Sequence, residues 1–144
     1  FAAGCGGDYK DKSASELQTM LSEGDDTERV QAAHGLGLKG DAGSVNKLVE
    51  SLDKSQPLRV RLEAVIALGK IGPPAVDAVT PLIGLLKNDE DDVVRMQAAT
   101  ALGRIGHADG LPALEAACDD ESQIVRRGAQ AAVEQLRTAS VESP

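Results

Sequence analysis

Few residues of this sequence have side chains of the types that perform acid–base, metal or nucleophilic chemistry. The histidines are His34, within an apolar helical pattern, and His107, two residues before Asp109. His107 and Asp109 suit a metal pair, but Asp109 is also placed to cap a following helix. The sequence has neither a phosphate-binding glycine loop nor a nucleophile elbow. We therefore expect no catalytic residue, no metal ligand and no cofactor, and a protein that is not an enzyme.

The acidic run from Asp89 to Asp92 is a second candidate for chemistry, because carboxylate oxygens bind calcium. The run lacks the ligand spacing and the glycine of an EF-hand loop. Helix capping and solubility explain the same residues, and we expect these roles instead.

The two cysteines, Cys5 and Cys118, stand in different contexts. Cys118 falls in the same apolar row as Leu52 and Leu86, which predicts a buried, unreactive thiol. Cys5 follows Ala2-Ala3-Gly4, and this pattern resembles the lipobox that ends a bacterial lipoprotein signal peptide. The resemblance implies lipid attachment at Cys5 and a flexible tether over residues 1–12. An ordinary N-terminus, or an epitope tag beginning Asp-Tyr-Lys-Asp at residue 8, stays open as an alternative.

Length and composition favour one helical domain. The chain has 144 residues, of which 42% are hydrophobic and only 1% aromatic, so the core must be aliphatic and rich in alanine. Closely packed helices suit such a core. The net charge of −8 repels phosphate backbones and anionic lipid surfaces, which argues against nucleic acid as a partner.

An internal repeat organises the chain. Residues 60–72 recur at 94–106, with an earlier copy at 29–40 and a degraded copy at 125–136. Each copy predicts a helix with one buried face, here called an A helix. A second apolar stripe follows each of the first three copies and predicts the B helices, at 45–52, 79–86 and 111–118.

The residues between these helices fit helix ends. Gly40, Gly72 and Gly106 follow the A helices and are expected to end them with a positive φ. Acidic turns precede the A helices and predict one acidic edge of the stack. Gly69 and Gly103 lie inside A helices, where glycine is unfavourable, so we expect close packing of A on B helices there.

The ends of the stack complete the prediction. Ser13 and Glu16 form a capping-box pattern before a lone B-like helix, and the chain closes with a lone A-like helix. In that last helix Gln130 and Glu134 are polar, as in a cap repeat or at a truncated edge. The predicted fold is an all-α solenoid of stacked antiparallel helix pairs, about eight helices in four layers. It covers residues 13–136, followed by a disordered tail at 137–144.

The repeated pattern Arg-x-x-Ala-Ala-x-Ala-Leu-Gly-x-Ile-Gly at 95–106 resembles the short HEAT-like repeat of phycobilin lyases and many bacterial scaffold proteins. The resemblance covers residues 13–136. It implies a right-handed superhelix with A helices on the convex side and B helices on the concave side. It implies little about activity, because this architecture serves many functions.

The same resemblance assigns partners to the repeat arginines. Arg61, Arg95 and Arg126 match an arginine that tends to pair with an aspartate at the end of the preceding B helix. Asp53 and Asp119 fit that position. Lys87 does not, and Asp89 is the substitute in the third layer.

The concave face is the remaining candidate for function. Along this face the side chains change from polar to small and apolar. Such a surface fits either a binding interface or a role in setting the curvature of the stack. The residues of the face are Asn46, Lys47, Glu50, Thr80, Gly84, Ala113 and Ala116.

We expect a protein-interaction or scaffold module with an unidentified protein partner. The expected location is the periplasmic face of a bacterial membrane, preferably the outer membrane, reached through a lipid anchor on Cys5. Two alternatives stay open: a subunit of bilin-lyase type, and a structural accessory subunit of a larger membrane-associated complex.

Overall fold

The computed structural model describes residues 9–142, and Cys5 lies outside this range. The described chain is all-α, as predicted. It contains eight α-helices: α1 (Ala14–Glu23), α2 (Asp26–Lys39), α3 (Val45–Glu50), α4 (Leu58–Ile71), α5 (Val79–Asn88), α6 (Asp92–Ile105), α7 (Leu111–Ala117) and α8 (Gln123–Glu142). Short 3₁₀ segments precede several of them: η1 (Tyr9–Asp11), η2 (Ala42–Ser44), η3 (Pro73–Ala78) and η4 (Ala108–Gly110).

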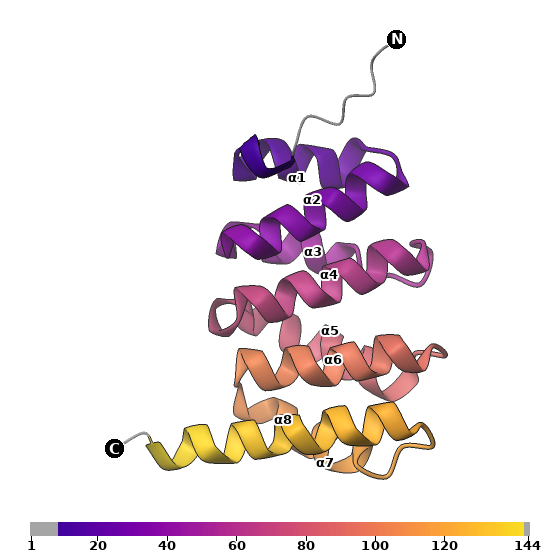
Figure 1. Ribbon diagram of the computed structural model, residues 1–144, viewed down its shortest axis with the longest axis vertical. Helices are drawn as coiled ribbons and strands as arrows, with labels where there is room; N and C mark the ends of the chain where they lie inside the picture. Colours follow the sequence, from indigo (N-terminus) through magenta and orange to yellow (C-terminus); the bar gives the residue numbers. More distant parts are fainter. Residues whose placement is uncertain (1–8, 143–144) are drawn as a thin grey trace.

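The helices form two rows that stack in four layers, which confirms the predicted solenoid. Helices α2, α4, α6 and α8 form the A row, and α1, α3, α5 and α7 form the B row behind it (Figure 1). Each A helix packs on the A helices of the neighbouring layers and on the B helix that precedes it in the chain. The buried aliphatic side chains form one continuous core along the stack.

Local sequence signals set the helix boundaries. Ser13 and Asp25 each form a complete capping box with the glutamate three residues later. Gly40, Gly72 and Gly106 have φ values of 63°, 73° and 76°, so the predicted positive φ at the A-helix ends is confirmed.

The glycines inside the A helices allow successive A helices to touch. A Cβ at Gly37 would lie 2.8 Å from the Cα of Ala67, and one at Gly69 would lie 3.1 Å from the Cα of Ala101. The expected packing of A on B helices at Gly69 and Gly103 is therefore wrong. The glycines face alanines of the next A helix, because helix backbones approach each other closely only where one side chain is absent.

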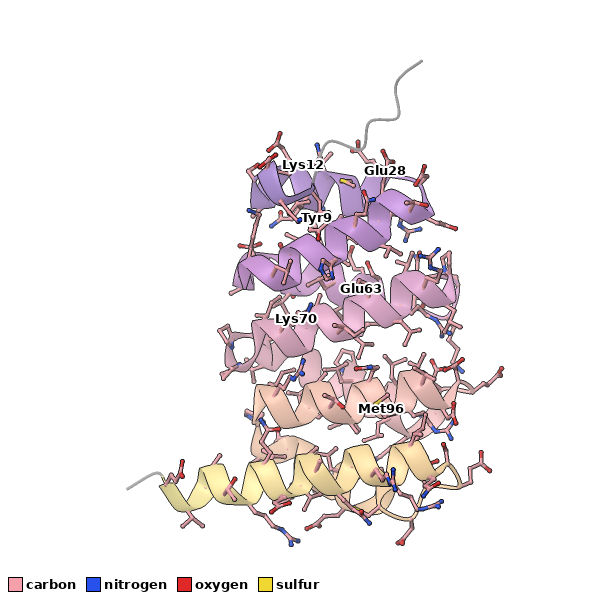
Figure 2. All side chains as sticks on the ribbon, viewed as in Figure 1. Tyr9, Lys12, Glu28, Glu63, Lys70 and Met96 are labelled. Atoms are coloured by element: carbon pink, nitrogen blue, oxygen red, sulfur yellow. The ribbon has the colours of Figure 1, made fainter. Side chains whose placement is uncertain are left out.

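The first layer is closed by the ring of Tyr9. Residues 9–11 form η1, which packs on α2, so the expected flexible tether over residues 1–12 is wrong for this part. Tyr9 of η1 packs against α2, where a Cβ at Gly35 would come within 3.1 Å of the tyrosine ring (Figure 2). Gly35 is the equivalent of Ala67, one repeat step of 32 residues earlier. Gly37 of the preceding A helix packs on Ala67, and Tyr9 takes the corresponding place on Gly35 in the first layer.

The last helix is longer than the sequence predicted. Residues 137–142 belong to α8, so the expected disordered tail is wrong for this part. The inner helix α6 ends because Gly106 adopts a left-handed conformation. Arg137 stands at the equivalent position, one repeat step of 31 later. A non-glycine residue disfavours that conformation, so the helix continues.

Candidate interaction surfaces

The repeat arginines join the layers, but in the opposite direction to the one expected. Arg61 donates from Nη1 to Asp89 Oδ2 at 3.0 Å, and Arg95 donates from Nε and Nη2 to both carboxylate oxygens of Asp120 at 3.0 Å. Each carboxylate lies after the next B helix, not the preceding one. The predicted pairing with Asp53 and Asp119 is therefore wrong.

The preceding turn contributes backbone carbonyls instead. Arg95 Nη1 donates to the carbonyl of Asp89 at 2.9 Å, and Arg126 Nη1 donates to the carbonyl of Asp120 at 2.8 Å. Asp89 therefore serves two arginines, through its carboxylate and through its carbonyl. The hydrogen bond from Arg95 lowers the pKa of the Asp120 carboxyl below its usual value. This part of the acidic edge binds layers together.

The residues expected on the interaction face lie mostly on the exposed side of the B row. Asn46, Glu50, Thr80 and Ala116 are exposed, and Lys47 reaches back to donate to Ser22 Oγ at 3.0 Å. Ala113 is 5% exposed and belongs to the core, so its predicted place on the face is wrong. It faces inward because it begins an apolar stripe with Ala117 on the short helix α7.

Two of the expected residues, Glu50 and Gly84, line a groove between α3 and α5. Its volume is about 780 Å³. The groove exists because α3 ends at Glu50, after six residues, whereas α5 continues for ten. Its walls combine apolar and charged groups: Val49, Glu50, Leu52, Asp53, Lys54, Pro81, Gly84, Leu85, Asn88 and Asp89.

Gly84 differs from the glycines of the A row. A Cβ at this position would meet no atom within 4 Å. A glycine in a helix interior destabilises the helix by about 1 kcal/mol relative to alanine. Helix packing accounts for this cost at Gly37, Gly69 and Gly103, but not at Gly84.

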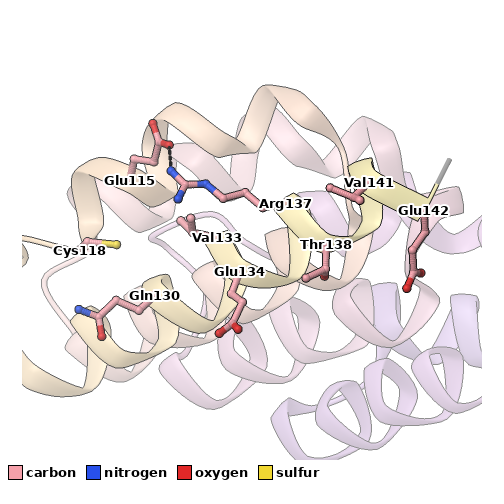
Figure 3. A pocket seen from close by; sticks show the side chains of 9 residues that line it. All are labelled: Glu115, Cys118, Gln130, Val133, Glu134, Arg137, Thr138, Val141 and Glu142. Carbon is pink, nitrogen blue, oxygen red and sulfur yellow. Dashed lines mark hydrogen bonds and ion pairs between the residues drawn. The ribbon is translucent and has the colours of Figure 1, made fainter. Parts of the chain in front are cut away.

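A second groove lies between α7 and α8 at the C-terminal end of the stack, and the sequence analysis did not identify it. Its volume is about 880 Å³ (Figure 3). Cys118 lines this groove and is half-buried, so its predicted full burial is wrong. Leu52 and Leu86, in the same apolar row, are 5% and 2% exposed. No helix within residues 9–142 covers Cys118 in the same way.

The histidines lie apart from both grooves. His34 Nδ1 is 2.7 Å from Glu63 Oε1 on α4, and its ring meets Tyr9 edge to face. His107 Nδ1 is 3.6 Å from Asp109 Oδ2, and the two side chains are 43% and 79% exposed. Residues 9–142 contain no cluster of three or more His, Cys, Asp or Glu side chains arranged to hold a metal ion.

The membrane prediction concerns Cys5, which precedes the described residues. In residues 9–142 no helix combines the length and the apolar character needed to span a bilayer.

Comparison with known proteins supports the repeat assignment. The profile of the HEAT repeats matches residues 14–95 and 60–134. A mouse protein, serine/threonine-protein kinase 36, is 31% identical over 159 residues, which is 90% of this chain and 12% of the kinase. An uncharacterized phycocyanin operon protein Z of Pseudanabaena tenuis is 35% identical over 105 residues, covering 67% of this chain and 50% of that protein. The chain therefore spans half or less of the length of these relatives.

Solved structures share the helix stack. Human deoxyhypusine hydroxylase has 29% identity and a TM-score of 0.74, over 88% of this chain and 44% of the hydroxylase. An engineered protein has 27% identity and a TM-score of 0.71, over 87% of this chain and 62% of that one. The expectation that the chain is not an enzyme does not hold, because the same architecture at this identity occurs in a hydroxylase.

Proposed function

Because this chain belongs to the HEAT repeat family, we propose that it is a scaffold module that holds a segment of a partner protein in the groove between α3 and α5. HEAT repeats as a class support a protein-interaction role. The observation that carries the proposal is Gly84, a helix-interior glycine that no internal packing requires and that opens into this groove.

The groove has features of a peptide-binding site. Small residues let a partner backbone approach, and Val49 and Pro81 provide apolar surface beneath it. Glu50, Asp53 and Lys54 along the rim supply charge for orientation. Hydrogen bonds from Ser55 lower the pKa of the Asp53 carboxyl, so it keeps its negative charge to a lower pH than an ordinary aspartate does.

Substitution of Gly84 tests this role. Gly84→Ala stabilises the fold by up to about 1 kcal/mol, because the helix gains propensity and the new methyl meets no atom. Gly84→Trp fills the groove without disturbing the core. A partner that cross-links to wild-type protein through a photoreactive residue at Asn88 is then lost from Gly84→Trp. Retention of the same cross-link in a correctly folded Gly84→Trp variant contradicts the proposal.

We also propose that the module is anchored through a lipid on Cys5, at the periplasmic face of a bacterial membrane, with the outer membrane favoured. The support is the lipobox-like sequence Ala2-Ala3-Gly4-Cys5. Several acyl chains give lasting attachment where one is marginal. Mass spectrometry of the native N-terminus tests the anchor, and an unmodified Cys5 in protein taken from its own membranes refutes it.

A second candidate function is that of a bilin-lyase-type subunit. It is favoured by the 35% identity to the phycocyanin operon protein Z. The test is to mix the chain with a bilin and an apo-phycobiliprotein, alone and with a second lyase subunit. An absorbance change that requires this chain supports the function, and the absence of any change in both mixtures rejects it.

A further inference from the structure

The groove between α7 and α8 occupies a place that a helix fills one layer earlier. On α6, Leu102 is 1% exposed because η4 covers it, and a Cβ at Gly110 would lie 3.4 Å from Leu102 Cδ2. η4 leads into α7, which packs on α5. Val133 of α8 is the equivalent of Leu102, one repeat step of 31 later. No described element follows α8 in the way that η4 and α7 follow α6, and Val133 is 8% exposed against 1% for Leu102.

The surface of the groove matches an amphipathic helix. Val133, Val141 and Cys118 line it with apolar groups, and Val141 is 85% exposed (Figure 3). Burial of such an exposed valine under a partner is favourable, because it removes apolar surface from water. The lining residues of α8 extend from Gln130 to Glu142, about 18 Å of helix at 1.5 Å per residue. A partner helix of about three turns spans this length.

The charges at the rim select the partner. Arg137 Nη2 lies 2.8 Å from Glu115 Oε1, so these two charges neutralise each other. Glu134 and Glu142 make no ion pair with any residue of the described chain, and both line the groove. Two unpaired carboxylates beside an apolar floor complement lysine or arginine side chains.

We propose that this groove binds an amphipathic helix of a partner protein that presents an apolar stripe flanked by basic residues. The site is separate from the groove at Gly84, so each proposal stands or fails on its own variants. Within the chain, η4 and α7 already cover the equivalent position on α6. In the proposed complex, a helix of a second molecule covers this position on α8.

The test uses two fluorescent peptides and the full chain. Each peptide has 16 residues, with leucines spaced to form one face of a helix and alanines elsewhere; one carries lysines beside the leucines and the other carries glutamates. We expect fluorescence anisotropy to show about tenfold tighter binding of the lysine peptide at low salt, because only its charges complement the groove. Equal affinity for the two peptides overturns the proposal.

Surface variants locate the binding site. The double substitution Glu134→Lys and Glu142→Lys reverses the preference between the peptides, and Val141→Asp weakens binding of the lysine peptide although it adds a negative charge. The matched control, Glu23→Lys, changes an exposed glutamate on α1 at the opposite end of the stack and leaves the preference unchanged (Figure 1). Thermal unfolding verifies that all variants fold. Binding that none of the groove variants alters places the peptide elsewhere and refutes the site.

A second copy of the chain is the competing occupant. Light scattering of the free protein distinguishes it from a partner helix. A monomer is expected, and a dimer that Val141→Asp dissociates overturns the proposal in favour of self-association through α8.

Discussion

Gly103 of α6 faces Ala132 of α8 so closely that a Cβ on residue 103 would lie 2.8 Å from the alanine Cβ. The same relation joins Gly37 to Ala67 and Gly69 to Ala101. Three successive interfaces of the A row therefore depend on the absence of a side chain at one repeated position. On α8 the equivalent position is Glu134, which is exposed.

This contact predicts a large effect of Gly103→Leu. The added side chain meets the backbone of α8, which cannot move aside as a flexible side chain would, so we expect a loss of about 1–3 kcal/mol in the free energy of unfolding. Gly84→Leu is the matched control, because its Cβ meets open space. Urea unfolding measures both variants, and equal stability of the two rejects the packing explanation.

The arginine pairs predict a difference between two substitutions of the same kind. Arg95 uses Nε, Nη1 and Nη2 to bond Asp120 and the carbonyl of Asp89, a geometry that one ammonium group cannot reproduce. Arg61 bonds Asp89 through Nη1, and its buried Nε has no hydrogen-bond partner among the described residues.

We therefore expect Arg95→Lys to destabilise the protein more than Arg61→Lys does, by about 1–2 kcal/mol, since hydrogen bonds to charged groups contribute about 1.5–3 kcal/mol each. Chemical denaturation of the two variants provides the comparison. A larger loss for Arg61→Lys contradicts the assignment of hydrogen bonds.

The lowered pKa of Asp120 predicts a dependence of stability on pH. The carboxyl has a lower pKa when folded than its ordinary value of 3.8, chiefly because Arg95 donates hydrogen bonds to it. The stabilisation is therefore complete above pH 3.8 and is lost as the pH falls through the folded-state pKa. Asp120→Asn removes this contribution, so the stability difference between wild type and variant shrinks on acidification. A difference that stays constant between pH 6 and pH 2 contradicts the prediction.

The extension of α8 depends on Arg137. Arg137→Gly places a glycine at the position where Gly106 ends α6, and we expect residues 138–142 to lose helical structure. Hydrogen exchange of their amides becomes faster. Arg137→Ala also removes the ion pair with Glu115 but keeps a good helix former. If both variants exchange equally fast, the ion pair rather than the backbone holds the extension.

Much of the architecture could be predicted from the sequence. Apolar spacing within each repeat identified the helices, and Ser13, Gly40 and Gly106 marked helix ends, because these signals depend on residues within one or two turns. Of the expected interaction face, Asn46, Glu50, Thr80 and Ala116 are exposed and Gly84 lines a groove, whereas Ala113 faces the core.

Relations between layers were decided only by the tertiary structure. Arg61 and Arg95 lie 28 and 25 residues before their aspartate partners, and the sequence offers acceptable carboxylates on both sides of each arginine. The direction of pairing follows from the offset between stacked helices, which packing of side chains such as Ala101 and Ala132 fixes. The groove at Gly84 arises where α3 ends before α5 does, and the groove at Val133 lies on α8, which no later element of the described chain covers. The spacing of apolar residues within a helix depends only on nearby residues of the chain. The contacts between different helices are determined only when the helices pack together.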